Sequence, residues 1–412
     1  MTPTTATSLL LITAAAVAAP LLSELFARWR VPSVLFELLL GILIGPAVLG
    51  WAHLDSFVDG LSTLGLGFLF FLAGYELDTE RTRGEPFRRA MTGWAITVVL
   101  GLAIAAVMVA SGFVLSDLLI GLALTTTAIG VLLPMMADRG LLTTRFGDFL
   151  VSAGAVGEFG PVLAVTIFLG TSDPTIESLL LIAFLLVALA LAAVVRRPTS
   201  PRFVSVMRRH LDTSAQLPVR VVILLTTAMI TIAVVLTLDM LLGAFAAGLI
   251  GRILFPPAES SALGSKLQSI GYGFLIPLFF VVSGMRFDLG ALTSSWSVAV
   301  RVPLFLALFL VVRGLPALFV YRRALPKRQR VALAVLQSTS LPLLIVITQI
   351  GLETHHMKPE NAAALVGAGM LSVLVLPLTG FAILGDTPDG TGQPVDPAGA
   401  PDRSPLDTEP ST

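Results

Sequence analysis

The sequence predicts an all-α polytopic membrane protein, and three of its features lead to that prediction. Of its 412 residues, 55% are apolar and only 13% are charged, with a mean hydropathy of +0.91. A surface that faces water needs more polar residues than this. The lipid bilayer is therefore expected to be the main solvent of the chain.

The second feature is a series of continuous apolar stretches. Crossing about 30 Å of hydrocarbon takes roughly 20 helical residues, and thirteen stretches of the chain are apolar over about such a length. Because their apolar residues do not alternate with polar ones, they predict helices and not the strands of a membrane barrel. The predicted helices span residues 8–27, 34–51, 60–77, 90–112, 116–137, 147–170, 176–195, 218–237, 239–255, 267–285, 297–321, 331–352 and 361–384.

The third feature is the position of the basic residues, which gather in the cytoplasmic loops of membrane proteins. With the N-terminus outside, thirteen crossings place 21 basic residues in inner loops and two, Arg286 and Lys358, in outer loops. If one helix had been missed or added, the asymmetry would be reversed in all loops that follow the miscounted helix. The pattern supports the helix count and predicts a multi-pass protein of the cell membrane, with its N-terminus outside and its C-terminus in the cytoplasm.

Charge and residue usage argue against several functional classes. The 26 basic and 26 acidic residues cancel, so no basic excess points to a nucleic-acid partner. The sequence has no cysteine, and its four histidines fall in predicted loops. It also lacks a His-Glu zinc motif and a Gly-x-Ser-x-Gly elbow. We expect no cofactor and no enzymatic activity.

Three short echoes, in the same order, relate the two halves of the chain, with spacings of about 202 to 211 residues. They pair residues 37–41 with 239–243, 70–78 with 279–288, and 127–141 with 338–352. Six helices, a linker helix and six more helices make the halves opposite in membrane orientation, as inverted repeats are. The predicted units are a first repeat (8–170), a linker helix with a cytoplasmic loop (171–217), a second repeat (218–385) and a disordered cytoplasmic tail (386–412).

The fifth and twelfth predicted helices contain the segments TTTAIGVLLP (125–134) and QSTSLPLL (337–344). Hydroxyl groups beside Gly or Pro at mid-membrane favour broken helices, whose unwound backbone can bind ions. The alternative is that these hydroxyl groups only bond to their own helices. The candidate oxygen ligands are Thr126, Thr127, Ser338, Thr339 and Ser340.

Glu158 lies near the middle of the sixth predicted helix, between glycines 154, 157 and 160. An ionisable group at that depth costs about 2.5 to 3.5 kcal/mol, so it needs a partner or a role. The small glycines leave room beside Glu158, so we expect either another helix or a hydrated ion to approach it closely. The alternative is a protonated side chain with a structural hydrogen bond.

Arg313, in the eleventh predicted helix, is the candidate for charge compensation. Its guanidinium is always charged and could pair with Glu158 or with carbonyl groups at a helix end. The competing expectation is that the side chain extends to the inner membrane surface.

The segments GILIGPAVLGW (41–51), FFLAGYELD (70–78) and TTTAIGVLLPMMADRGLLTTRFG (125–147), with an acid eleven residues after Gly147, resemble the monovalent cation:proton antiporter-2 family. This resemblance implies a core with two crossing broken helices that moves against a scaffold, usually in a homodimer. It also implies that the acid at Glu158 binds proton and cation in turn and that Arg313 matches the family's basic residue. The sequence departs from the family at Gly157, because the family commonly has Asn, Gln or Asp before its acid.

The expected function is secondary active antiport of Na⁺ or K⁺ against H⁺ by alternating access. With one acid in the site, competition for Glu158 would make the exchange one for one and electroneutral. The alternative is a sodium- or proton-coupled transporter of an organic substrate with the same fold.

Overall fold

The structure, a computed structural model, describes residues 2–26, 31–77, 84–137, 139–169, 174–195, 206–207, 209–210, 213–255 and 257–385. In these ranges every regular element is a helix, and no strand occurs. The predicted tail (386–412) and much of the predicted linker loop (196–205) lie outside the described residues.

The predicted membrane helices coincide with apolar helices of the structure. Among the described residues, nine helices are long and apolar enough to cross a membrane, and four apolar helices are shorter. Together they correspond to the thirteen predicted stretches, and most of their ends fall within a few residues of the predicted ones. The all-α, polytopic fold class is confirmed.

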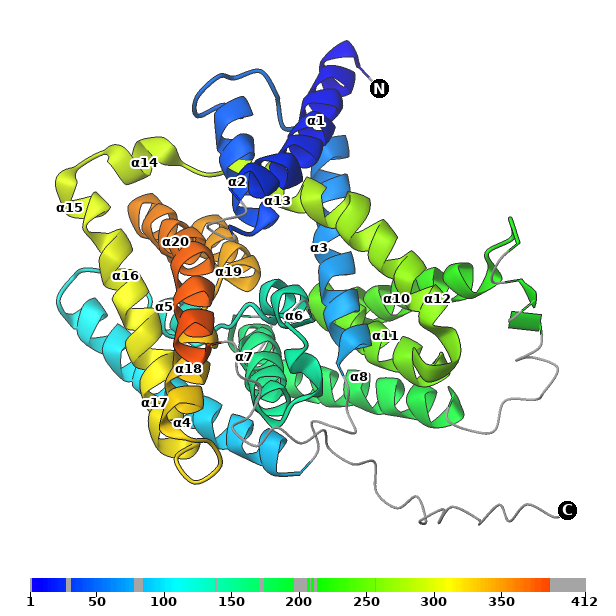
Figure 1. Ribbon diagram of the computed structural model, residues 1–412. Coiled ribbons are helices and arrows are strands. Elements are labelled where there is room, and N and C mark those ends of the chain that lie inside the picture. Colours follow the sequence, from blue (N-terminus) through cyan, green and yellow to red (C-terminus); the bar gives the residue numbers. More distant parts are fainter. Residues whose placement is uncertain are drawn as a thin grey trace, which may run out of the picture.

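The helices form two bundles, which Figure 1 shows side by side, with α6 and α7 near their boundary. What we call the scaffold bundle contains α1 (Pro3–Leu25), α2 (Ser33–Ile44), α3 (Ser56–Glu76), α10 (Leu217–Val235), α11 (Met240–Leu254), α12 (Pro257–Ile270), the π-helical turn η3 (Gly271–Leu275) and α13 (Ile276–Met285). What we call the core bundle contains α4 (Glu85–Ala110), α5 (Asp117–Leu124), α6 (Ile129–Ala137), α7 (Arg145–Leu169), α16 (Arg301–Phe309), the π-helical turn η4 (Leu310–Gly314), α17 (Leu315–Val320), α18 (Lys327–Leu336), α19 (Pro342–Glu353) and α20 (Pro359–Leu384).

The remaining elements connect the helices of these bundles. The helix α8 (Pro174–Val195) follows the core helix α7 and also packs against α11 of the scaffold. The small helices α14 (Leu289–Thr293) and α15 (Trp296–Ala299) lead from α13 to α16. The 3₁₀ turn η2 (Leu141–Thr143) joins α6 to α7. Direct packing between the bundles is sparse compared with packing inside each of them.

The scaffold helices approach each other backbone to backbone at glycines. A Cβ atom on Gly41 of α2 or on Gly284 of α13 would collide with the backbone of the facing helix. The same holds for Gly74 of α3 and Gly248 of α11. Small residues allow this close approach between membrane helices. The scaffold is therefore tightly packed where α2 meets α13 and where α3 meets α11.

Two core helices are interrupted, as the sequence predicts. The first break separates α5 from α6, and the second separates α18 from α19. At the first break, the hydroxyl groups of Thr125 and Thr126 donate to Leu122 O (2.8 Å) and Ala123 O (2.9 Å) at the end of α5. Such bonds compete with the helical amides for these carbonyl groups and favour an end to the helix.

Proline has a different role in the two breaks. Pro342 occupies the first position of α19, where its missing N–H costs no hydrogen bond. Pro134, in contrast, lies inside α6, and the first break precedes it. A Pro therefore adjoins the second break, whereas threonines end the helix at the first.

Candidate functional site

The two unwound segments, 125–128 and 337–341, cross and are joined through their backbones. The amide of Ala128 donates to the carbonyl of Thr339 over 2.7 Å. The amide of Thr127 donates to the carbonyl of Gly157 in α7 over 3.0 Å. Because these groups have no partner within a helix, the crossing supplies their hydrogen bonds. The crossing also fixes α7 beside both breaks.

Glu158 lies on α7 beside this crossing and is 1% exposed. Its carboxylate accepts hydrogen bonds from the backbone amides of Ile129 and Gly130, in the first turn of α6. The N-terminus of a helix carries a partial positive charge, which stabilises an anion there. The Oε2 atom of Glu158 has no hydrogen-bond partner among the described residues. One oxygen atom of a buried carboxylate is thus available to a ligand.

Arg313 lies on the turn η4 and is 2% exposed. Its Nε and Nη2 atoms donate to the hydroxyl oxygen of Thr127 over 2.9 and 2.6 Å. Nη2 also donates to Ala153 O over 3.1 Å. The side-chain amide of Gln337 donates in turn to Arg313 O over 2.5 Å. Through its guanidinium and its backbone carbonyl, Arg313 therefore holds the first unwound segment, α7 and the second unwound segment together.

This placement distinguishes between the expectations for Arg313. The side chain bonds to unwound segments and to a carbonyl group, which was one of the two predicted partnerships. It forms no ion pair with Glu158, since none of the ion pairs between described residues joins these two. It does not extend to a membrane surface either, because its guanidinium is buried among the broken helices.

The five candidate oxygen ligands lie in or beside the crossing, but their hydroxyl groups have different partners. Those of Thr126 and Ser340 bond to each other. Thr127 donates to Gln337 O over 2.6 Å. Ser338 bonds back to Ala334 O over 2.8 Å.

Thr339 differs from the other four. Its side chain is 0% exposed, and its hydroxyl oxygen has no hydrogen-bond partner among the described residues. The expectation that hydroxyl groups only satisfy their own helices thus describes Ser338, whereas Thr339 Oγ1 is free to bind a ligand.

The glycines around Glu158 accommodate protein side chains. A Cβ atom on Gly157 would collide with Nη2 of Arg313, and one on Gly154 would meet the side chain of Ile129. A Cβ atom on Gly160 would collide with the indole ring of Trp94. The space that the sequence suggests for a large ligand at these glycines is therefore occupied by the core itself.

Some residues beside the site were not predicted from the sequence. Ser372 of α20 accepts from Ser340 N and donates to Ser340 O, each over 3.0 Å, and so fixes the second break. Phe159, next to Glu158, stacks on Phe245 of α11 with ring planes 24° apart and meets Phe70 of α3 edge-on. Its position next to Glu158 was the only available signal for Phe159.

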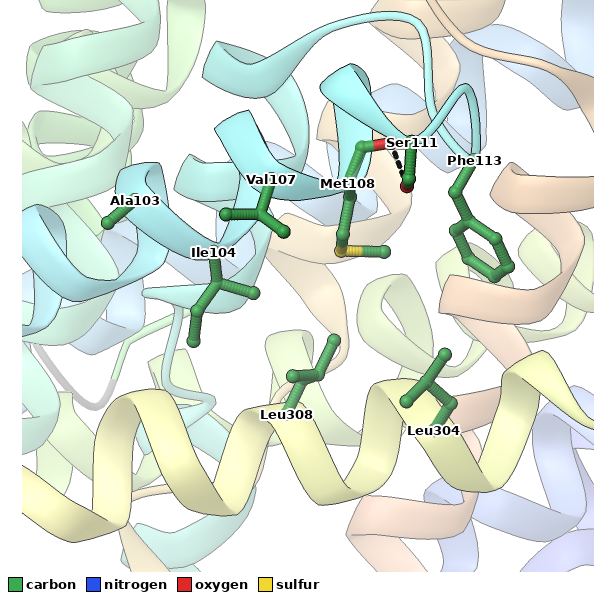
Figure 2. A pocket seen from close by; sticks show the side chains of 8 residues that line it. All are labelled: Ala103, Ile104, Val107, Met108, Ser111, Phe113, Leu304 and Leu308. Atoms are coloured by element: carbon green, nitrogen blue, oxygen red, sulfur yellow. Dashed lines mark hydrogen bonds between the residues drawn. The ribbon is translucent and has the colours of Figure 1, made fainter.

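Two other features of the described residues bear on what the site can bind. No group of three or more His, Cys, Asp or Glu residues that could hold a metal ion occurs among them. One hollow, shown in Figure 2, lies between α4 and α16 and is lined by apolar side chains such as Val107 and Leu308, with Ser111 at one end. The Ser111 hydroxyl bonds to Met108 O over 2.9 Å. This hollow contains neither Glu158 nor any other charged group.

Residues 12–385 match the family model described as Sodium/hydrogen exchanger, transmembrane. The chain is 26% identical over 394 residues to a putative Na(+)/H(+) antiporter, YjbQ, of Bacillus subtilis (strain 168), covering 92% of this chain and 63% of that protein. It is 25% identical to a Na(+)/H(+) antiporter of Enterococcus hirae, covering 86% of this chain and 92% of that protein.

The fold is similar to that of the sodium proton antiporter MjNhaP1 from Methanocaldococcus jannaschii, with a TM-score of 0.62 and 16% sequence identity over 89% of this chain and 94% of the other. The chain spans less than two thirds of several relatives that it matches, for example 63% of YjbQ and 46% of Cation/H(+) antiporter 18 of Arabidopsis thaliana.

Proposed function

Because the chain belongs to the sodium/hydrogen exchanger family, we propose that it is a secondary active antiporter that exchanges a monovalent cation, Na⁺ or K⁺, for H⁺. The observation that carries this proposal is Glu158, a buried carboxylate with one unpartnered oxygen atom at the crossing of two broken helices. The relatives named as Na(+)/H(+) antiporters support cation and proton exchange. A relative from Bacillus cereus named as a Na(+)/H(+)-K(+) antiporter supports including K⁺.

The cation ligands follow from the unpartnered atoms of the site. Glu158 Oε2 and Thr339 Oγ1 are buried oxygen atoms without hydrogen-bond partners among the described residues. Their residues are bonded to successive amides, since Ala128 N donates to Thr339 O and the next amide, that of Ile129, donates to Glu158. Na⁺ and K⁺ bind to carboxylate, hydroxyl and unwound carbonyl oxygens. Thr126, Thr127, Ser338 and Ser340 then act mainly by holding the unwound backbone in place.

Exchange results from competition for one carboxylate. A proton on Glu158 removes its charge, and a bound cation neutralises it, so either ligand gives a site that can cross the membrane region. The bare carboxylate should not cross. Arg313 remains bonded to Thr127 whichever ligand Glu158 binds. Its charge therefore moves with the core in both directions and does not change the net charge transported per cycle. The exchange is then one for one and electroneutral, and one pH unit sustains a cation gradient of about tenfold.

The movement we propose is alternating access, with the core bundle moving against the scaffold bundle. The sparse packing between the bundles and the close packing inside the scaffold support such a rigid-body motion. The inverted repeats, residues 8–170 and 218–385, would each supply one broken helix to the core. The linker at 171–217 would connect them.

We also propose an orientation, a location and an assembly. Many described basic residues gather where α4 and α18 begin and where α17 and α20 end; Arg89 donates to Val320 O over 2.5 Å, and Arg328 donates to Ile383 O over 2.6 Å. Basic residues favour the cytoplasmic side. We therefore propose that this end faces the cytoplasm of a cell-membrane protein, with the N-terminus outside. We propose a homodimer from the family resemblance, which cross-linking in native membranes tests.

An organic substrate, the alternative function, has less support. It would need space beside Glu158, and the positions next to glycines 154, 157 and 160 are filled by Ile129, Arg313 and Trp94.

Transport by the purified protein in proteoliposomes tests the proposed function. A pH gradient is imposed, NaCl, KCl or choline chloride is added, and internal pH is followed. We expect Na⁺ or K⁺, but not choline, to drive proton movement, and Glu158→Gln to abolish it. The matched control is Glu24→Gln, the same change at an exposed side chain of α1. Proton movement that persists in Glu158→Gln, or that needs no small cation, would refute the proposal.

A further inference from the structure

The apolar hollow between α4 and α16 runs from a polar end toward the middle of the membrane region. Its volume is about 470 Å³, and apart from Ser111 every residue that lines it is apolar. Ser111 is exposed and marks the polar end, where Figure 2 also places Leu304 and Phe113, with Leu308 farther along. Ala103 lies at the other end, about 12 Å along α4. The hollow is thus elongated and suited to an apolar chain.

The hollow opens onto a surface that faces lipid. Val107 of α4 is 70% exposed and Leu304 of α16 is 40% exposed. Both side chains belong to segments that are long and apolar enough to cross a membrane. Because an exposed apolar surface at this depth faces acyl chains, a lipid can enter the hollow sideways from the bilayer.

Arg301 lies beside the polar end of the hollow. It is the first residue of α16, three residues before Leu304, and residues at this spacing share a helix face. Its Cζ atom lies 4.5 Å from the centroid of the Phe113 ring. Since Leu304 and Phe113 both line the hollow, two independent contacts place the guanidinium at this end.

The position of this guanidinium is set by the fold. Its Nη1 atom donates to Oδ1 of Asn361 in α20, which is 0% exposed. Nδ2 of Asn361 donates in turn to Phe113 O over 3.0 Å. The start of α16, the start of α20 and the loop after α4 are therefore joined around Arg301, and its charge is held beside the hollow.

The groups around Arg301 leave its charge without an anionic partner. Asn361 and Phe113 are neutral, and Nε has no hydrogen-bond partner among the described residues. Asp117, at the start of α5, and Glu360, at the start of α20, do not pair with it, since no ion pair between described residues includes Arg301. An arginine is always charged, so an anion at this end would be stabilised.

We propose that the hollow and Arg301 bind one anionic phospholipid, with an acyl chain between α4 and α16 and the headgroup phosphate at the guanidinium. Arginine forms strong, charge-assisted hydrogen bonds with phosphate, and the apolar lining accepts the chain. In the proposed orientation this lipid belongs to the outer leaflet. The inference does not depend on the proposed antiport.

A lipid in this hollow stabilises the core bundle beside the first break. Gly101 lies one turn from Ile104, which lines the inner part of the hollow. A Cβ atom on Gly101 would lie 3.2 Å from the side chain of Thr125 and 3.4 Å from that of Val312 on η4. The acyl chain thus fills the space between α4 and α16 next to the point where α4 meets the unwound segment and η4.

Lipid titrations of the purified, delipidated protein in detergent test the proposal. The thermal midpoint is followed as phosphatidylglycerol, or phosphatidylcholine with the same acyl chains, is added. We expect phosphatidylglycerol to raise the midpoint at the lower concentration and sodium phosphate alone to leave it unchanged. Arg301→Gln should raise the half-maximal concentration of phosphatidylglycerol about fivefold, because one basic residue contributes about that factor to binding an anionic lipid. It should not alter the value for phosphatidylcholine.

Two controls separate the charge of Arg301 from its contribution to stability. Arg301→Lys keeps the charge and should keep the preference for phosphatidylglycerol. Arg220→Gln makes the same neutralising change at an exposed arginine of α10 and should also keep it.

A second variant tests the hollow without changing Arg301. Val107→Trp would fill the hollow and should abolish the stabilisation by phosphatidylglycerol. Its matched control is Val99→Trp, on the same helix, which is also 70% exposed but does not line the hollow. This control should respond to the lipid as the wild type does.

Equal responses of the wild type to the two lipids would overturn the proposal, as would a rise with sodium phosphate alone that matches phosphatidylglycerol. An unchanged preference in Arg301→Gln would exclude the guanidinium as the headgroup site. An unchanged response in Val107→Trp would exclude the hollow as the place of the acyl chain.

Discussion

Arg313 bonds to Thr127 through two nitrogen atoms, with Nε and Nη2 at 2.9 and 2.6 Å from the same hydroxyl oxygen. The Thr127 hydroxyl in turn donates a hydrogen bond to Gln337 O. One arginine thus stabilises both unwound segments at the point where they cross. The positive charge beside the site is held by backbone and hydroxyl groups, and it forms no ion pair with Glu158.

Arg313→Lys keeps the positive charge but loses the forked geometry. Hydrogen bonds of charged groups contribute about 1.5 to 3 kcal/mol each, and lysine cannot replace the two bonds to Thr127 with one atom. We expect a lower thermal midpoint in detergent and slower transport. A Lys variant as stable and active as the wild type would show that only the charge of Arg313 matters.

Gly157→Ala tests the close approach of Arg313 to α7. The added Cβ atom would collide with Nη2 and lie 2.7 Å from Thr127 Oγ1. Because such overpacking costs about 1 to 3 kcal/mol, we expect a lower thermal midpoint.

The control for this substitution is Gly60→Ala in α3, where a new Cβ atom would have no neighbour within 4 Å. It should be neutral or stabilising, by about 0.5 to 1 kcal/mol. If Gly157→Ala were equally harmless, the described position of the guanidinium would be wrong.

Thr339→Val removes the unpartnered hydroxyl oxygen and keeps the shape of the side chain. No hydrogen bond to a described residue is lost, so stability should change little, whereas cation KM should rise by about threefold to tenfold. Ser338→Ala, which removes a hydroxyl group bonded to Ala334 O, is the control and should leave KM unchanged. Transport kinetics in proteoliposomes measure both. An unaltered KM in Thr339→Val would remove Thr339 from the cation ligands.

Phe245→Leu tests the aromatic contact between the bundles. Phe245 stacks on Phe159 beside Glu158, and we expect this stack to exclude water from the site on one side. Loss of this stack should increase proton leak into proteoliposomes that have a membrane potential and are suspended in a solution with choline as the only added cation. Phe149→Leu, which removes a ring packed against Tyr321 inside the core, should not. Equal leak in the wild type and Phe245→Leu would exclude this role.

The sequence predicts those parts of the fold and site that follow from the free-energy cost of placing a particular residue in an apolar helix. Thr125 to Thr127 and Pro342 mark the breaks because they interrupt apolar helices with groups that end a helix. Glu158 is evident because an acid is expensive at that depth. Basic residues such as Arg322 and Arg323 mark one end of the helices. The family that the sequence motifs resemble agrees with the family model that the chain matches.

The partners of the site residues could not be predicted, because they depend on how distant helices pack. Arg313 has a long side chain with several acceptors within reach, and only the crossing selects Thr127 over Glu158. The free oxygen of Thr339 cannot be distinguished by sequence from the bonded one of Ser340. Gly157 suggested room for another helix or for a hydrated ion, and only the folded chain shows that a guanidinium group from another helix fills it.

The central claim is that one carboxylate, Glu158, binds the cation and the proton in turn. Its most direct test is proton release by the purified protein in weakly buffered detergent solution, after addition of NaCl or KCl, with choline chloride as the blank. We predict saturable release approaching one proton per chain, at a pH where Glu158 is protonated, and none from Glu158→Gln. Cation binding without proton release, or equal release from Glu158→Gln, would contradict the account.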